Sequence, residues 1–111
     1  MFGKYIIGVI ETENNEALLS KEKLKKSVLE ACRACKLNIV GEKFHVFGNP
    51  KGITYCFILS QSHFIVHTWP EAQKILLDIF TCDNEKNSED CIKTLAHQLN
   101  GKVVYIKQIN V

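Results

Sequence analysis

Two apolar runs joined by a short polar segment constrain the fold of this chain more than any other feature. The runs are ITYCFIL at residues 53–59 and HFIVHTW at residues 63–69, with the polar segment SQS between them. Short runs of β-branched and aromatic residues that alternate with polar ones are typical of strands, so the segment predicts a hairpin. Alternation places one set of side chains on a common face: His63, Ile65, His67 and Trp69. Because polar chemistry breaks the core-like pattern there, we expect a functional site on that face.

The rest of the chain supplies further strands and two helices. Strands are predicted over residues 4–10, 39–47, 53–59, 63–69, 74–81 and 103–109, and helices over residues 21–36 and 89–99. Ser20 and Ser88 are suitable N-cap residues for these helices. Signals conflict at residues 68–71, where TWPE fits a capping box, but the alternation that follows favours a strand. The β-α-β-β-β-β-α-β order predicts an α+β fold, a two-layer sandwich with both helices on one face of an antiparallel sheet.

Composition is that of a globular protein with a single domain, residues 1–111. Hydrophobic residues make up 46% and charged residues 23%, which argues against disorder. The net charge of +2, with lysines interleaved with acids, argues against a nucleic-acid partner. The apolar runs are far shorter than the roughly 20 residues that a membrane helix needs. The first residues lack the features of a signal peptide. We therefore expect a cytoplasmic protein with no nucleic-acid or membrane partner.

The cysteines predict reduced thiols. There are five of them, an odd number that does not suit a disulfide framework. Cys32 and Cys35 form a single C-x-x-C pair, which inside a helix reflects packing of small side chains more often than metal binding or redox chemistry. We assign Cys56 and Cys91 to buried packing as well. No metal site is expected.

Three motifs at fixed spacing carry a resemblance to a known family. SQSH at residues 60–63 is followed by HTWPE at 67–71 and DIFTC at 78–82, and FHVF precedes them at 44–47. Together they resemble the prokaryotic S-adenosylmethionine decarboxylase proenzymes, which read S/A-E-S-H-x-x-x-H-T-W-P-E, then D-x-F-T-C-G, with F-H-x-F upstream. The resemblance covers residues 2–110. It implies two-layer protomers that pair into homodimers and share active sites across the interface.

The resemblance implies that the chain cuts itself between Gln61 and Ser62. The products would be a beta chain of residues 1–61 and an alpha chain of residues 62–111. Ser62 would attack the carbonyl of Gln61, β-elimination would split the resulting ester, and the serine would become a pyruvoyl group. His67 matches the family's proton-transfer group for this processing. Residues implied to assist are Thr54, Gln61 and His63.

The implied activity is decarboxylation of S-adenosylmethionine, which supplies the aminopropyl donor for spermidine biosynthesis. The pyruvoyl group would take the place of pyridoxal phosphate, without a metal, by condensing with the substrate amine and accepting electrons as carbon dioxide leaves. Cys82 matches the family's proton donor. Phe47 and Trp69 match aromatic residues that contact the adenine and the sulfonium. Glu71 matches the carboxylate that binds the ribose hydroxyls.

The sequence also departs from the family pattern and so leaves alternatives open. Gln61 replaces the usual glutamate, Asp83 and Tyr55 replace glycines, and the turn in residues 47–52 is one residue longer. Changes near the pocket with intact processing residues also fit a decarboxylase of arginine or ornithine, in which Glu71 would meet a cation. A processing-dead paralogue that regulates an active partner is a third alternative, favoured only by Gln61.

Each of these residues has a plain structural role as its alternative. Ser62 would then be a hairpin residue, His67 a half-buried histidine, Cys82 a buried thiol and Asp78 a brace. The aromatic side chains Phe47 and Trp69 would belong to the core.

Overall fold

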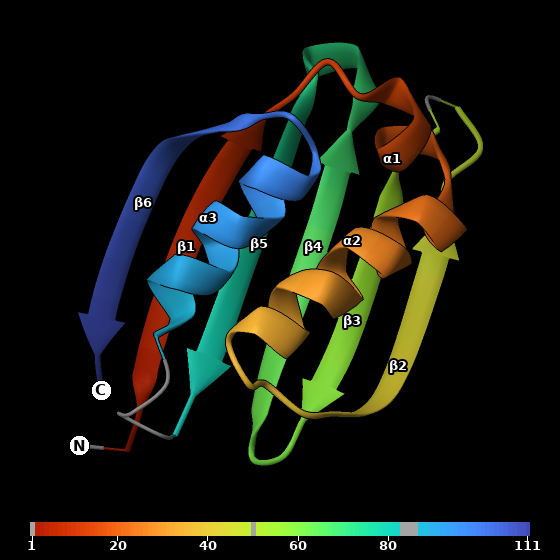
Figure 1. Cartoon of the computed structure of the whole chain (residues 1–111). Coiled ribbons are helices and arrows are strands. Elements are labelled where there is room, and N and C mark those ends of the chain that lie inside the picture. The colour runs from red at the N-terminus through yellow and green to blue at the C-terminus, as the bar shows by residue number, and fades with distance from the viewer. Residues whose placement is uncertain (1, 50, 83–86) are drawn as a thin grey trace.

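The computed structural model describes residues 2–49, 51–82 and 87–111, and in these ranges it contains one antiparallel sheet of six strands. The strands lie in the order β2-β3-β4-β5-β1-β6 across the sheet (Figure 1). Their bounds are Lys4–Glu11 (β1), Ile39–Val46 (β2), Ile53–Leu59 (β3), Ser62–Trp69 (β4), Lys74–Thr81 (β5) and Lys102–Asn110 (β6). The six predicted strands are confirmed, and β3 and β5 begin and end where the sequence alternation predicts.

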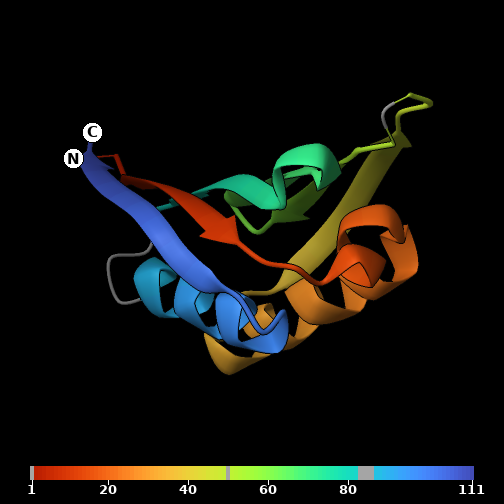
Figure 2. The same cartoon turned by 90° about the horizontal axis from the view of Figure 1, so that it is seen from above.

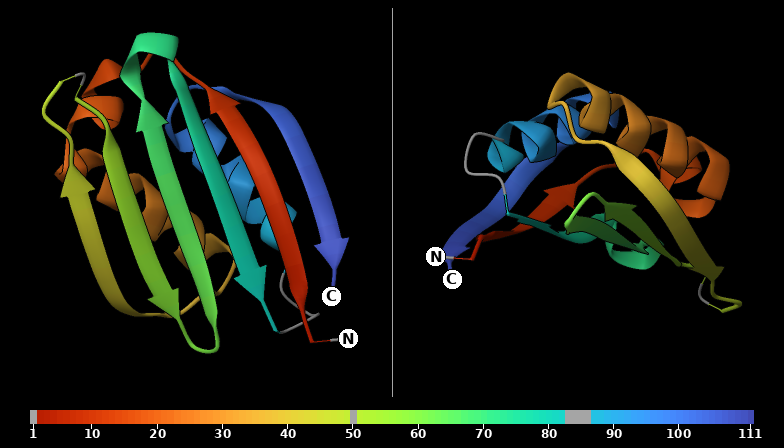
Figure 3. Two further views of the ribbon diagram at one scale, coloured as in Figure 1. Left: turned by 180° about the vertical axis from the view of Figure 1, so that it is seen from behind. Right: turned by 90° about the horizontal axis from the view of Figure 1, so that it is seen from below.

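Helices cover one face of the sheet and leave the other face without helices (Figures 2 and 3). They are α1 (Asn15–Leu19), α2 (Lys21–Ala34) and α3 (Ser88–Gln98), and a single 3₁₀ turn, η1 (Pro70–Ala72), links β4 to β5. The two-layer α+β sandwich is thus confirmed, with one short helix more than predicted. The turn η1 resolves the conflicting signals of the TWPE segment, since one helical turn forms and the strand follows it. Within the described ranges, no helix is both long and apolar enough to cross a membrane.

The additional helix α1 forms between the first predicted strand and the first predicted helix, where the sequence pattern predicts neither. The side chain of Asn14 caps it by accepting a hydrogen bond from the Ala17 amide at 3.2 Å. The Thr68 hydroxyl of β4 donates to the carbonyl of Leu18 at 2.9 Å. Because a helix of this length is not stable by itself in water, the tertiary contact with β4 accounts for its presence.

Side-chain caps fix where the two longer helices begin. Ser20 caps α2 as predicted, and its hydroxyl accepts from the Lys23 amide at 3.3 Å. The prediction for α3 is wrong, because Ser88 is already the first helical residue and is buried. Asn87 is the cap, with its side chain accepting from the Asp90 amide at 3.1 Å. Asparagine and serine cap helices about equally well, so the local sequence did not decide between these neighbours.

Alternate strand residues fill the space between sheet and helices. In β4, Phe64, Val66 and Thr68 are buried under the helices, while the residues between them face the side without helices. The largest fully buried side chains are Ile6, Ile10, Leu18, Leu24, Ile53, Phe57, Phe64, Ile75, Leu77, Ile79, Ile92 and Leu95. Cys91 is buried as predicted. The same assignment is wrong for Cys56, which is half-buried and pairs with Ile65 on the uncovered face.

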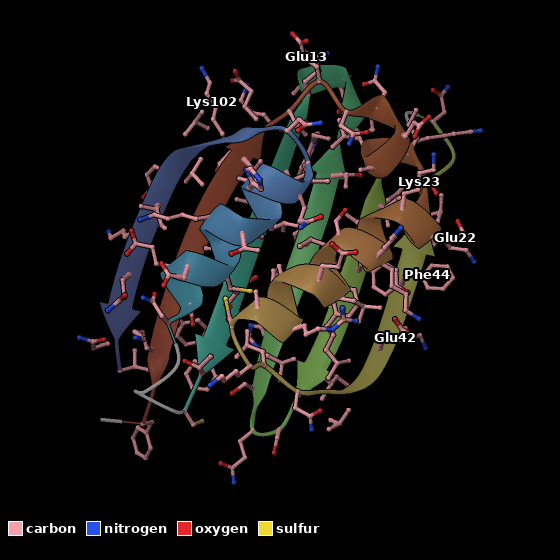
Figure 4. All side chains as sticks on the ribbon, in the orientation of Figure 1. Glu13, Glu22, Lys23, Glu42, Phe44 and Lys102 are labelled. Atoms are coloured by element: carbon pink, nitrogen blue, oxygen red, sulfur yellow. The ribbon has the colours of Figure 1, made fainter. Side chains whose placement is uncertain are left out.

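The edge strand β2 is tied to the helical layer by polar and aromatic contacts (Figure 4). The Lys21 ammonium lies 4.1 Å from the centre of the Phe44 ring. Glu42 accepts hydrogen bonds from Lys25 and, at 2.7 Å, from the Tyr55 hydroxyl. Tyr55 is buried on this side of the sheet, so its replacement of the family's glycine lies away from the uncovered face.

Candidate functional site

The first half of the candidate site is the tight turn between β3 and β4. Leu59 pairs directly with Ser62, which leaves a two-residue loop of Ser60 and Gln61. Gln61 has φ of 59°, in the left-handed region that non-glycine residues seldom occupy. Such conformations cost about 1–3 kcal/mol and cluster at functional sites. The peptide bond predicted to be cut therefore follows a strained residue.

Cys82, which directly follows β5, completes this end of the site. Its thiol donates a hydrogen bond to the carbonyl oxygen of Gln61 at 3.0 Å, and its amide donates to the hydroxyl of Ser62 at 3.4 Å. The contact arises because β5 runs antiparallel to β4 and ends beside the hairpin turn. Cys82 is exposed, so its alternative as a buried thiol does not hold. Cys82 thus contacts the residue on each side of the Gln61–Ser62 peptide bond.

His63 and Asp78 form a second polar pair next to Ser62. Nε2 of His63 donates to Oδ2 of Asp78 at 2.6 Å, and both side chains are about 30% exposed on the uncovered face. The ring of Tyr5 lies 6.1 Å from that of His63. Asp78 therefore holds His63 in position, which agrees with the structural role as a brace that the sequence analysis gives it.

The second half of the candidate site is a cavity of about 380 Å³ at the opposite end of β4. It is lined by Phe47, Asn49, Gly52, Ile53, Thr54, His67, Thr68, Trp69 and Glu71. Phe47 and Trp69 are 49% and 46% exposed, which excludes their alternative as core aromatics. Gly52 forms part of the wall, where a Cβ atom would meet the carbonyl oxygen of Thr68 at 2.8 Å. Only glycine leaves room for this approach of the two backbones.

Thr54 and His67 face each other across the β3–β4 pair. The Thr54 hydroxyl and Nδ1 of His67 are 2.9 Å apart and hydrogen-bonded. The ring of Trp69 lies 6.2 Å from that of His67. On β2, His45 packs edge-on against Phe47 with ring centres 4.6 Å apart. Sequence reasoning missed His45, although its register opposite Thr54 places it on the same face.

One protomer does not bring the two halves together. Ser62 and His67 are five residues apart on the same strand, and at about 3.3 Å per residue they are separated by about 16 Å. Gln61, His63 and Cys82 lie at the Ser62 end, whereas Thr54, Phe47, Trp69 and Glu71 lie at the His67 end. A proton cannot pass directly over such a distance.

Two sequence expectations concern residues near these halves. Asp83, which follows Cys82, lies outside the described residues, as does Pro50 of the longer turn. Across the described ranges, no group of three or more histidine, cysteine and acidic side chains is arranged to hold a metal ion.

Comparisons with known proteins place the chain in a family. The family model for S-adenosylmethionine decarboxylase matches residues 4–110. The chain belongs to the S-adenosylmethionine decarboxylase family. A relative from Methanococcus maripaludis, named S-adenosylmethionine decarboxylase proenzyme, is 32% identical over 107 residues, which cover 96% of this chain and 87% of the relative. A Clostridium botulinum relative of the same name is 39% identical over 99 residues, or 89% of this chain and 79% of its own length.

The fold agrees with this membership in the S-adenosylmethionine decarboxylase family. The crystal structure of the adenosylmethionine decarboxylase from Aquifex aeolicus matches with a TM-score of 0.79. The match covers 97% of this chain and 87% of that chain at 22% sequence identity. The two proteins therefore share their architecture.

Proposed function

We propose that this protein is a pyruvoyl-dependent S-adenosylmethionine decarboxylase that is made as a proenzyme and cut between Gln61 and Ser62. The observation that carries the proposal is the contact of Cys82 with both sides of that bond, through its thiol to the Gln61 carbonyl and its amide to the Ser62 hydroxyl. The family model and the relatives named as proenzymes support the same activity.

The turn supplies the nucleophile and a hydrogen-bond donor for the developing oxyanion of the cleavage reaction. The Ser62 hydroxyl attacks the carbonyl carbon of Gln61, and negative charge develops on the oxygen to which the Cys82 thiol donates. A donor already aimed at that oxygen stabilises the transition state. The peptide becomes an ester, and removal of the Ser62 α-proton by a base, for which His67 of a second copy is the candidate, then expels the Gln61 carboxylate. Residues 1–61 and 62–111 separate as chains, and the dehydroalanine left at residue 62 takes up water and loses ammonia to give the pyruvoyl group. Gln61 is attacked at its backbone, so its amide side chain does not prevent the reaction.

The same residues fit the pyruvoyl group that would replace Ser62. When present, this group supplies an electron sink for loss of carbon dioxide from an amino acid. The serine oxygen leaves with the Gln61 carboxylate, so the Cys82 amide, which donates to that oxygen at 3.4 Å in the uncut chain, would lie beside the new group. The exposed Cys82 thiol lies beside the group and would deliver the proton that the substrate's α-carbon needs after decarboxylation.

The cavity at the far end of β4 is suited to the nucleoside part of the substrate. Phe47 and Trp69 expose ring faces on which an adenine stacks and against which a sulfonium rests favourably. Glu71 lines the same cavity, where its carboxylate accepts hydrogen bonds from the ribose hydroxyls.

A homodimer would bring the two separated halves of the site together. Two copies that pair through their uncovered sheet faces, with strands running in opposite directions, would place Ser62 of one copy near His67 of the other. Exposed apolar side chains on that face support such pairing: Tyr5, Ile58, Leu76, Tyr105 and Ile109. An apolar face of this kind is stabilised by burial against a partner.

Intact-mass spectrometry of the purified protein beside a Ser62→Ala variant tests the proposal. We expect two chains that meet at Gln61/Ser62, with the second chain gaining two hydrogens after borohydride reduction, and a single uncut chain for Ser62→Ala. Release of carbon dioxide from S-adenosylmethionine, compared with arginine and ornithine, then identifies the substrate. A single full-length species after long incubation would overturn the proposal and favour the regulatory paralogue.

A further inference from the structure

Three of the five cysteines meet where the last turn of α2 approaches the first turn of α3. Cys32 and Cys35 close α2, and Cys91 begins α3. Cys32 and Cys91 are 2% and 0% exposed, and Cys35 is half-buried. Yellow sulfur atoms are visible between these two helices in Figure 4. The helix packing thus adds a third thiol to the C-x-x-C pair, on the side of the sheet that the catalytic halves do not use.

The thiol of Cys91 is the centre of this cluster. Its thiol interacts with the thiols of both Cys32 and Cys35. The interaction with Cys91 lowers the pKa of Cys32, while the same interaction and burial raise the pKa of Cys91. Burial also raises the pKa of Cys35.

We propose that this cluster is a redox site in which Cys91 forms a disulfide with one cysteine of the C-x-x-C pair. The oxidant is a small disulfide compound of the glutathione type. Half-buried Cys35 attacks it first, forming a mixed disulfide and releasing one small thiol. The sulfur of Cys91 then attacks Cys35 and releases the second small thiol. Two protein thiols are oxidised, one small disulfide is reduced to two thiols, and those thiols carry away the two protons.

The disulfide has a specific consequence because it spans the cleavage site. Cys32 and Cys35 belong to residues 1–61, whereas Cys91 belongs to residues 62–111. In the cut enzyme the bond would join two separate chains covalently. This consequence rests on the proposed function, while the disulfide itself does not, because it can form in an uncut chain as well.

The experiment oxidises the purified protein with oxidised glutathione and measures intact mass in denaturant without reductant. We expect the two chain masses to be replaced by one mass, equal to their sum less two hydrogens, and to return after reduction. Tryptic peptides then locate the bond, because trypsin cuts after Arg33 and Lys36 and places the three cysteines in different peptides: 27–33, 34–36 and 87–93. A link from 87–93 to either of the others supports the proposal.

Matched variants and the uncut chain separate the possible outcomes. Cys91→Ala should abolish the joined mass, whereas Cys56→Ala, which removes a half-buried thiol on the other face of the sheet, should keep it. The peptide link should also form in the Ser62→Ala chain, so failure of cleavage does not hide the result. No link to peptide 87–93, a link between peptides 27–33 and 34–36 alone, or a joined mass that survives Cys91→Ala would each overturn the proposal.

Discussion

The two faces of the sheet are built from the same strands, but one face packs against the helices and the other presents polar side chains. Under the helices, Phe64 and Val66 of β4 are fully buried among other apolar side chains. On the other face of the same strand, His63 and His67 take part in polar pairs and remain accessible. Because neighbouring strand residues point to opposite sides, one face can be selected for packing and the other for chemistry. Substitutions of adjacent residues should therefore change either stability or reaction rate.

The largest expected effect is on the uncovered face. We expect His67→Ala to slow the cleavage between Gln61 and Ser62 by about 10²–10⁴-fold, the usual contribution of a proton-transfer group. The time course of the cut chains by mass spectrometry measures the rate. Thr54→Ala, which removes the hydrogen bond to His67, should slow cleavage less, and Thr54→Ser should behave like the unaltered protein. Cleavage of His67→Ala at the normal rate would contradict the assignment.

Co-expression sharpens this prediction by testing where the histidine acts. If it serves the other copy, a His67→Ala chain paired with a Ser62→Ala chain should be cut, since the Ser62→Ala copy supplies an intact His67. The His67→Ala chain expressed alone should stay largely uncut. Equal failure in both cases would show that the two halves do not combine across copies.

The next largest effect is on the helix-covered face. Phe64→Ala removes a fully buried ring and should lower the free energy of unfolding by about 3–5 kcal/mol. Urea unfolding at fixed protein concentration, in the uncut Ser62→Ala background, measures it. Ile65→Ala, one residue along on the uncovered face and half-buried, is the matched control with a smaller expected loss. The contrast between the faces would fail if Phe64→Ala also slowed cleavage under conditions where the variant is fully folded.

The smallest expected effect is on the pH dependence of stability, and it concerns the hydrogen bond between Tyr55 and Glu42. Burial, and then the hydrogen bond to Glu42, raises the pKa of Tyr55 above its usual value of about 10. A raised folded-state pKa gives stability that is fully present below about pH 10 and is lost as the pH rises further. Tyr55→Phe should cost about 1 kcal/mol at neutral pH and remove that alkaline loss. Tyr105→Phe, an exposed tyrosine, serves as the control in urea titrations from pH 7 to 11. An unchanged alkaline loss in Tyr55→Phe would refute the assignment.

The sequence predicts features that depend on neighbouring residues better than features that depend on contacts between residues far apart in the chain. The strands and the shared face of His63, His67 and Trp69 follow from alternation between neighbours, and the structure confirms them. Helix α1 was not predictable, because its hydrogen bond to Thr68 joins residues far apart in the chain. The start of α3 was missed because Asn87 and Ser88 are equally good caps locally.

The site shows the same limit. Motif spacing predicted the candidate residues, but the contact of Cys82 with Gln61 depends on the β4–β5 register, and the approach of Cys91 to the C-x-x-C pair depends on helix packing. Neither contact can be predicted from a pattern of residues along the chain. The separation of Ser62 from His67, in contrast, follows from strand rise alone once both are assigned to one strand.

The strand order interleaves the segments that precede and follow the proposed cleavage site. Residues 1–61 provide β1, β2 and β3, and residues 62–111 provide β4, β5 and β6. In the sheet, β1 lies between β5 and β6, so a strand of the first segment is enclosed by strands of the second. If the chain is cut as proposed, we therefore expect it to fold before the cut, while both segments are still one molecule. A cut protein that unfolded would have to reassemble from two chains at a rate set by their concentrations, so unfolding would be harder to reverse after the proposed cut than before it.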